Sequence, residues 1–296
     1  MQEITKKPHK YSLIVYLLLA NGITWLGWIP GLIIGAKQGY IMPNFDTYTT
    51  LWETGFTNSQ HMFLGIVFQL GVYGPLFGGL VATWMDGGRE GIANLWQRIT
   101  RWRINGRWYL IALGITFLVA GLPVGVFALF GGFSPSSVVL SNVLFVLIAQ
   151  LFTSGFGEEP GWRGFLLPRL KARSEGENYI WLLGLFWAIW HYPLVILQTL
   201  SIMQDVTIPQ MAITIIMALA GQTMALIGMT YLYAWIYNQT DSVFLAIVFH
   251  AFSNLFSFWL LSFLAEPQAV TLFVALMPWA VVVFLQKRLG KDKFPG

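Results

Sequence analysis

Four polar side chains that can transfer protons lie inside or beside long apolar segments of this chain. Glu158 and Glu159 follow an apolar run in FGEEPGWRGF, His191 interrupts LFWAIWHYPL, and His250 interrupts IVFHAFSNLF. Ionisable groups in membrane-type segments cost about 2.5–3.5 kcal/mol each on insertion scales, so they mark candidate functional sites. Each has a plainer explanation, since two glutamates can form a hydrated helix end and a lone histidine can bond to a neighbouring helix. Their joint occurrence favours a shared site.

The spacing of these residues suggests different tasks for them. Glu159 and Arg163 are four residues apart, so on a continuing helix they can pair and leave Glu158 free to act. His250 and Asn254 are also four apart, which places an imidazole and a carboxamide on one helix face, both able to donate hydrogen bonds. A carboxylate that accepts a proton, with donors that hold an anion, is the equipment for hydrolysing a peptide bond with activated water.

The same side chains could also hold a metal ion. Two histidines and one glutamate, here His191, His250 and Glu158, are a known ligand set of catalytic zinc. Water polarised by Glu158 and His191 without a metal is an alternative that the sequence leaves open. The chain has no cysteine, which excludes thiolate ligands, disulfides and a cysteine nucleophile. A divalent metal, with zinc as the candidate, is therefore the one cofactor to consider.

Taken in order, these residues resemble the motifs of the CPBP intramembrane proteases. This family is also called the CAAX-protease and bacteriocin-processing, or Abi, family, and it includes the type II CAAX prenyl endopeptidases. The matching residues are EExxxR at 158–163, a histidine after an aromatic segment at His191, and HxxxN at 250–254. The resemblance covers about residues 137–260. The second motif of the family is usually FxxxH, and we interpret Trp187, four residues before the histidine, as a packing variation that keeps an aromatic ring.

The resemblance implies a role for each matched residue. Glu158 would be the general base that activates water, and His191 would position or coordinate that water. His250 and Asn254 would form the oxyanion hole of the tetrahedral intermediate, and the Glu–Arg pair would support the site. The resemblance also implies an enzyme, an intramembrane endopeptidase commonly described as a metalloprotease, that acts on a CAAX-like or bacteriocin-type substrate.

The elements that must position these residues are membrane helices. The 296 residues are 56% hydrophobic and 10% charged, with a mean hydropathy of +0.63, against about 25% charged residues in soluble domains. The fold class is therefore all-α: a polytopic membrane bundle in a single domain over 1–296, with 137–260 as its catalytic core. The uncharged segments, the longest of them divided at Gly131–Ser137, accommodate about eight spanning helices. The expected spans are 11–36, 62–85, 108–130, 137–157, 178–198, 210–236, 242–264 and 268–286.

Basic residues predict how the bundle is oriented. Of the 17 lysines and arginines, 16 fall on one side of the predicted spans and Lys37 lies on the other. Basic residues favour the cytoplasmic side, so both termini are expected there (N-in, C-in). The predicted spans place His191 and His250 deep in the membrane but Glu158 close to the cytoplasmic surface. We therefore expect the fourth span to be longer, with a bend at Pro160–Gly161, and the active site to open to the cytoplasm through a water-filled cavity.

Two classes of function remain open from the sequence. The first is an endopeptidase of the plasma membrane, whose partners are the lipid bilayer and a peptide or membrane-protein substrate. The second is a non-proteolytic protein, either a proton-coupled transporter or a peptide-immunity binding protein. The outer halves of the spans hold no ionisable residue, which favours the protease because a proton path needs such groups on both halves. The basic and aromatic stretch at 89–108 is interpreted as an inner loop with interfacial anchors, so no nucleic-acid partner is expected, and the oligomeric state is left open.

Overall fold

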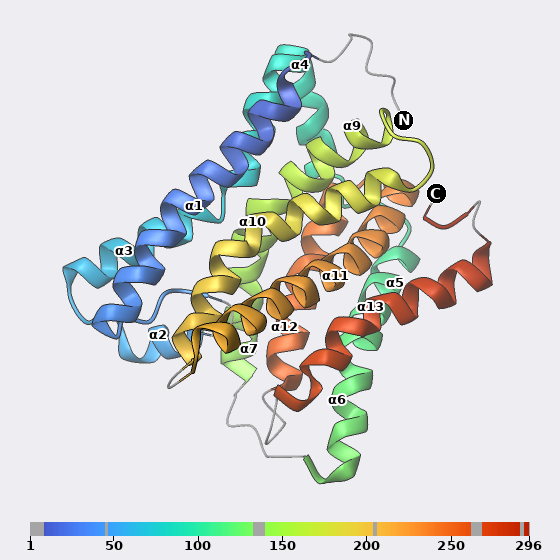
Figure 1. The fold of residues 1–296 in the computed structure, drawn as a ribbon. Coiled ribbons are helices and arrows are strands. Elements are labelled where there is room, and N and C mark those ends of the chain that lie inside the picture. Colours follow the sequence, from blue (N-terminus) through green and yellow to red (C-terminus); the bar gives the residue numbers. More distant parts are fainter. Residues whose placement is uncertain are drawn as a thin grey trace.

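The computed structural model describes residues 9–44, 47–132, 140–203, 206–261, 268–290 and 293–295. Every regular element in these segments is helical, which confirms the all-α class (Figure 1). The α-helices are α1 (Ser12–Gln38), α2 (Tyr48–Thr54), α3 (Ser59–Gly71), α4 (Gly74–Ile99), α5 (Arg107–Thr116), α6 (Leu122–Phe127), α7 (Leu140–Gln150), α8 (Phe156–Glu159), α9 (Leu167–Lys171), α10 (Asn178–Ile202), α11 (Ile208–Thr240), α12 (Val243–Leu261) and α13 (Gln268–Leu289). Four π-helical segments join some of them: η1 (Phe117–Gly121), η2 (Ala128–Gly132), η3 (Leu151–Gly155) and η4 (Pro160–Leu166).

Several of these helices are long and apolar enough to cross a membrane. Within the described residues there are four such helices, Ser12–Gln38, Arg107–Phe130, Asn178–Ser201 and Ile208–Thr240, and the pair α3–α4, bent by 44°, makes a fifth if it counts as one span. They coincide with five of the predicted spans. Apart from Ser242, the chain is also helical in the described parts of the other three, and the count of eight stays a prediction.

The helices pack around α8, η4 and α12. Helix α1 lies against α3, α4 and α10, while α10 lies along α11 and α11 along α13 (Figure 1). Helix α12 contacts α5, α7 and η3. The segments that carry the three motifs of the sequence therefore meet inside the bundle.

The fourth span extends beyond 137–157, as expected, but without the predicted bend. The chain is helical from α7 through η3, α8 and η4 to Lys171 in α9, and Pro160, where a bend was predicted, keeps helical angles of φ −59° and ψ −33°. Proline lacks the N–H of a regular α-helical turn and crowds the preceding turn, and the wider π-helical turn that begins here accommodates it. Glu158 consequently lies within a continuous helical segment.

Glycines allow this segment to approach α4 closely. A Cβ atom on Gly161 would collide with the carbonyl of Pro75, and one on Gly79 would lie 3.0 Å from the Cα atom of Gly161. Small residues at such positions let two helix backbones come into direct contact, as is common between membrane helices. The contact fixes the helical segment just after Glu158.

Gly161→Ala is expected to destabilise the protein by about 1–3 kcal/mol, because the added methyl group overpacks the contact with α4. The matched control is Gly114→Ala in α5, where an added Cβ would meet nothing within 4 Å. Thermal unfolding in detergent measures the difference. Equal melting temperatures for the two variants would show that the close contact at Gly161 does not limit stability.

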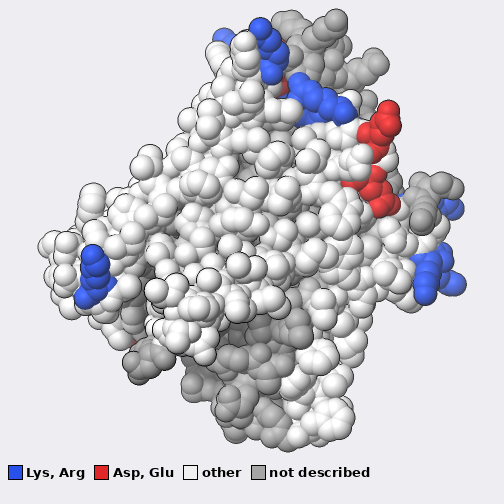
Figure 2. Space-filling view, in the orientation of Figure 1, with Lys and Arg blue, Asp and Glu red and all other residues white. Residues whose placement is uncertain are grey.

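Basic side chains mark one end of the bundle. Arg101 pairs with Asp241 at 3.1 Å, Arg169 pairs with Asp86 at 2.6 Å, and the backbone N–H of His9 donates to the same aspartate. Blue lysine and arginine side chains lie along the upper and right edges of the molecule in Figure 2, and a separate blue patch lies at the left. The basic end of the bundle is formed by residues 98–107, 169–177 and 287–290. The opposite end holds α2 and the C-terminal ends of α1 and α10.

Candidate active site

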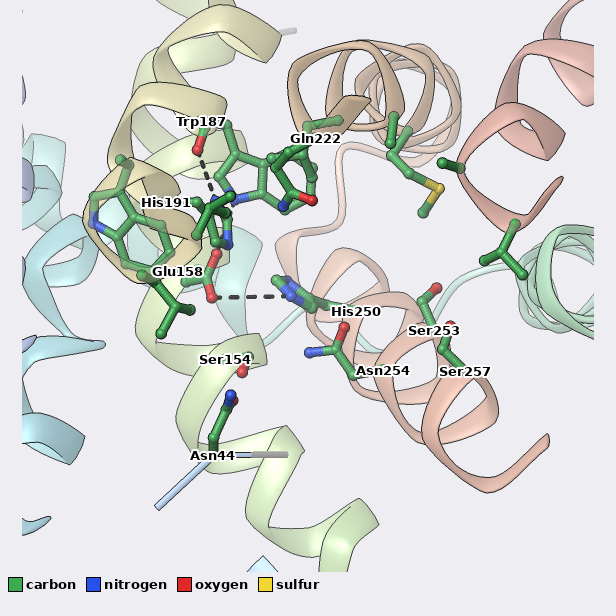
Figure 3. A pocket seen from close by; sticks show the side chains of 18 of the residues that line it. Asn44, Ser154, Glu158, Trp187, His191, Gln222, His250, Ser253, Asn254 and Ser257 are labelled. Carbon is green, nitrogen blue, oxygen red and sulfur yellow. Dashed lines mark hydrogen bonds and ion pairs between the residues drawn. The ribbon is translucent and has the colours of Figure 1, made fainter. Parts of the chain in front are cut away.

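Glu158, His191 and His250 line one cavity of about 470 Å³, although they come from α8, α10 and α12 (Figure 3). Glu158 is 4% exposed. Its Oε2 atom accepts a hydrogen bond from Nε1 of Trp187 at 3.0 Å, and its Oε1 atom lies 3.9 Å from Nε2 of His250. The second distance is too long for a hydrogen bond. The indole therefore holds one carboxylate oxygen and leaves the other facing the cavity.

The predicted pair of Glu159 and Arg163 forms, and it is fully buried. Nη1 of Arg163 lies 2.9 Å from Oε1 of Glu159, and neither side chain is exposed. The guanidinium also lies over the rings of Trp187 and Tyr233, at 4.2 and 3.9 Å from their centroids. A buried charge needs such partners, since transfer out of water costs several kcal/mol. The pair fixes the helical turn that follows Glu158.

Glu159 also holds His250. Nδ1 of His250 lies 2.7 Å from Oε1 of Glu159. Because the ion-paired carboxylate can only accept, the histidine donates through Nδ1, and its Nε2 atom is the one on the side of Glu158. The second glutamate of the motif thus orients the histidine of α12, a contact that spacing along the chain does not indicate.

His191 is fixed by the backbone of its own helix. Its Nδ1 atom lies 2.8 Å from the carbonyl oxygen of Trp187, which can only accept, so Nδ1 is the donor (Figure 3). In the neutral ring the other nitrogen, Nε2, is then an acceptor. A histidine in this tautomer can accept a hydrogen bond from a water molecule in the cavity.

Asn254 lines the same cavity as His250, as their spacing of four residues predicted. One N–H of its carboxamide donates to Oε1 of Gln150 at 2.8 Å, and Gln150 is 1% exposed. An amide nitrogen has two hydrogens, so a second N–H of Asn254 remains for a ligand. Gln150 thereby orients the carboxamide.

Two residues of this site were missed or misjudged from the sequence. Trp187 was interpreted as a packing variation, but its N–H contacts Glu158, its carbonyl holds His191, and its ring lies against Arg163. Gln150 was missed because it is uncharged and lies outside the matched motifs. The same signal in the sequence could have identified both residues, because a side-chain N–H in an apolar helix needs a hydrogen-bond partner.

The candidate metal ligands do not form a ready metal site. In the part of the chain that the structure describes, no three histidine, aspartate or glutamate side chains converge closely enough to hold a metal ion. Glu158, His191 and His250 share the cavity, but one oxygen of Glu158 is engaged by Trp187. Catalytic zinc commonly takes three protein ligands, and this donor set does not fit that arrangement.

The rest of the cavity wall is largely apolar. Side chains from α10, α11 and α13 line it, among them Leu194, Leu226, Met229, Val274 and Pro278. A carboxylate, two imidazoles and a carboxamide thus lie beside a space suited to uncharged groups. The arrangement can bind an apolar chain and activate a water molecule next to it.

Comparison with known proteins finds similarity in the same segment of the chain that carries the site. The family model described as type II CAAX prenyl endopeptidase Rce1-like matches residues 140–256. The protein named CAAX prenyl protease 2 from Methanococcus maripaludis is 26% identical over 184 residues. That match covers 62% of this chain, and the chain spans 62% of the length of that relative. The matched residues include every member of the cavity site from Gln150 to Asn254.

Proposed function

We propose that this chain, whose residues 140–256 match the Rce1-like family model, is a member of the CPBP/CAAX protease family and an intramembrane endopeptidase. It cleaves a peptide bond in a peptide or a membrane-associated protein. The observation that supports this proposal most directly is the cavity in which Glu158, His191, His250 and Asn254 meet. We also propose that the chain crosses the plasma membrane eight times and has both termini in the cytoplasm.

The proposed reaction begins with activation of water. A water molecule donates one hydrogen bond to the free Oε1 of Glu158 and one to Nε2 of His191. Glu158 takes a proton as the water oxygen attacks the carbonyl carbon of the peptide bond. Because Trp187 holds Oε2 of Glu158, the carboxylate accepts the proton of the water on Oε1.

The second half of the reaction depends on donors for the oxyanion. His250 with protons on both ring nitrogens donates from Nε2, and Asn254 donates its second N–H. The proton on Glu158 then passes to the departing amine, so that the C–N bond breaks and a carboxyl group and a free amine leave. Glu159 and Gln150 act as positioning residues, since each holds one of the two donors.

Asn254→Ala is expected to lower kcat by about 10²–10³-fold with a smaller change in KM, which is the usual loss for one oxyanion donor. Gln150→Ala frees the carboxamide without removing it and is expected to have a smaller effect. Kinetics in detergent with both variants measure the difference. If Asn254→Ala left kcat unchanged, this residue would have no role in the oxyanion hole.

Removal of metal is expected to leave activity intact, because the proposed steps use side chains only and the donor set does not fit zinc. The measurement is cleavage by protein treated with chelator and shown to be metal-free by elemental analysis. Activity lost on chelation and restored by zinc would instead assign Glu158, His191 and His250 as metal ligands.

A non-proteolytic function is the second candidate. Peptide-immunity binding would use the same cavity without hydrolysis, and proton-coupled transport would use its carboxylate and histidines. The fixed hydrogen bonds of Glu158 and His191 favour catalysis, because groups that relay protons between two sides must reach partners beyond the site.

The experiment that separates these functions compares peptide termini. Membranes and medium of cells that carry the wild type are compared with those of cells that carry Glu158→Gln. New termini that occur only with the wild type identify substrates and cleavage positions. Identical sets of termini, with the purified wild type inactive on membrane peptides, would favour the binding protein.

A further inference from the structure

The hydroxyl of Thr24 joins three helices next to the wall of the active-site cavity. Thr24 is 0% exposed and lies in α1, which packs against both α3 and α10 (Figure 1). Its hydroxyl donates to the carbonyl oxygen of Gly71, the last residue of α3, at 2.7 Å. The same oxygen accepts from Nε1 of Trp190, in α10, at 2.8 Å. Because a hydroxyl has one proton, the bond to Gly71 leaves its lone pairs for the indole N–H.

Glycines and a proline create this junction. A Cβ atom on Gly74 would collide with Oγ1 of Thr24, and one on Gly27 would lie 2.9 Å from the Cα atom of Gly71. The residue four positions after Gly71 is Pro75, which has no N–H to donate to the Gly71 carbonyl. The break between α3 and α4 therefore supplies a free acceptor, and the glycines let α1 approach closely enough to use it.

Helix α1 also holds the backbone of Trp190. Nε1 of Trp25 donates to the carbonyl oxygen of Trp190 at 3.0 Å, so consecutive residues of α1 contact the main chain and the ring of one tryptophan. Pro193 lies inside α10, two residues after His191. A proline removes one backbone hydrogen bond and crowds the preceding helical turn, and side chains of neighbouring helices can supply the lost support. The two contacts from α1 stabilise the turn that carries His191.

The ring of Trp190 restricts the orientation of His191. Their ring centroids are 4.6 Å apart and the rings are almost perpendicular, at 89°. Trp28 of α1 packs against the same indole, with ring centroids 4.6 Å apart. The hydrogen bond from Nδ1 of His191 to the carbonyl of Trp187 fixes one atom of the imidazole and leaves the ring free to tilt. Packing against the fixed indole removes that freedom and sets the direction of Nε2.

We infer that Thr24 is a positioning residue of the active site, which fixes the indole of Trp190 and through it the imidazole of His191. Trp190 and His191 line the cavity, whereas Thr24 does not. Thr24 also lies outside residues 140–256, the segment that matches the family model. The effect on cleavage rests on the proposed function, in which His191 holds the attacking water. The effect on the imidazole does not.

The first test is kinetic. Thr24→Val keeps the shape of the side chain and removes the hydroxyl, and it is expected to lower kcat by about 10–10²-fold with little change in KM, because it displaces the group that holds the water. Thr24→Ser keeps the hydroxyl and is expected to recover most of the wild-type kcat. The matched control is Thr230→Val, a residue at 0% exposure whose hydroxyl donates to the carbonyl of Leu226 in its own helix. It is expected to leave kcat unchanged.

The second test does not require cleavage. The chain has four histidines, so protein with isotope-labelled imidazoles gives few nitrogen NMR signals, and His191→Gln identifies those of His191. We expect His191 of the wild type to give one set of signals, typical of a ring protonated on Nδ1. Thr24→Val is expected to broaden or split this set and to leave the signals of His250 unchanged. Thr24→Ser and Thr230→Val are expected to resemble the wild type.

Two results would overturn the inference. If Thr24→Val matched Thr230→Val in both kcat and the His191 signals, the hydroxyl would not position the imidazole. If Thr24→Ser lost as much activity as Thr24→Val, with both melting temperatures lowered, the loss would come from packing and not from the hydrogen bonds. Altered His191 signals in Thr24→Val, together with a wild type that cleaves no peptide, would contradict the proposed function and leave the positioning role intact.

Discussion

Glu158→Gln is expected to lower kcat by about 10²–10⁴-fold while the protein keeps its fold, because glutamine cannot take the proton of the attacking water. The substitution keeps the shape of the side chain and an oxygen that can accept from Nε1 of Trp187, the contact that holds the carboxylate at 3.0 Å. Cleavage by purified protein in detergent, with the melting temperature measured in parallel, separates lost chemistry from lost structure.

The matched control for this variant is Glu175→Gln. Glu175 is an exposed glutamate in the segment between α9 and α10, at the basic end. Removing its charge is expected to leave both kcat and melting temperature unchanged. A Glu158→Gln protein that cleaved as fast as this control would exclude Glu158 as the general base, and the proposed reaction would be wrong.

Arg163→Met is expected to have the largest effect on stability, about 3–5 kcal/mol, because it leaves the carboxylate of Glu159 buried without its countercharge. The variant also removes the guanidinium between the rings of Trp187 and Tyr233. The control is Arg103→Met, an exposed residue of the basic end, for which a change within about 0.5 kcal/mol is expected. Unfolding in detergent measures both variants.

The double variant Glu159→Leu/Arg163→Met separates charge from packing. Replacing both members of a buried pair with apolar residues is often neutral, so much of the lost stability should return. Activity should stay low, because His250 then has no acceptor for Nδ1. If the double variant were as unstable as Arg163→Met alone, the loss would arise from the packing of the arginine and not from its charge.

Helix periodicity made part of the site predictable. His250 and Asn254 line one cavity, and Glu159 pairs with Arg163, because residues four apart share a helix face whatever surrounds the helix. The all-α class and the positions of the longest spans also follow from composition and uncharged length. The catalytic roles of these residues remain predictions that the variants above test.

Contacts between helices could not be predicted from the sequence. The hydrogen bond from Trp187 to Glu158 and that from His250 to Glu159 depend on how α8, α10 and α12 turn toward one another, which no periodicity within a single helix reveals. The bend predicted at Pro160–Gly161 does not form, for a local reason. Proline usually ends or bends a helix, whereas here the chain continues through Pro160 as a π-helix held by close packing against α4.

The packing at the basic end has a consequence for the permeability of the membrane. Trp162, Phe165, Leu166 and Leu167, in the segment that follows Glu158, are all 0% exposed. In the described part of the chain, no residue of the basic end lines the active-site cavity. Close packing therefore separates the cavity from that end, so water bound beside Glu158 would not provide a path for ions through the bundle.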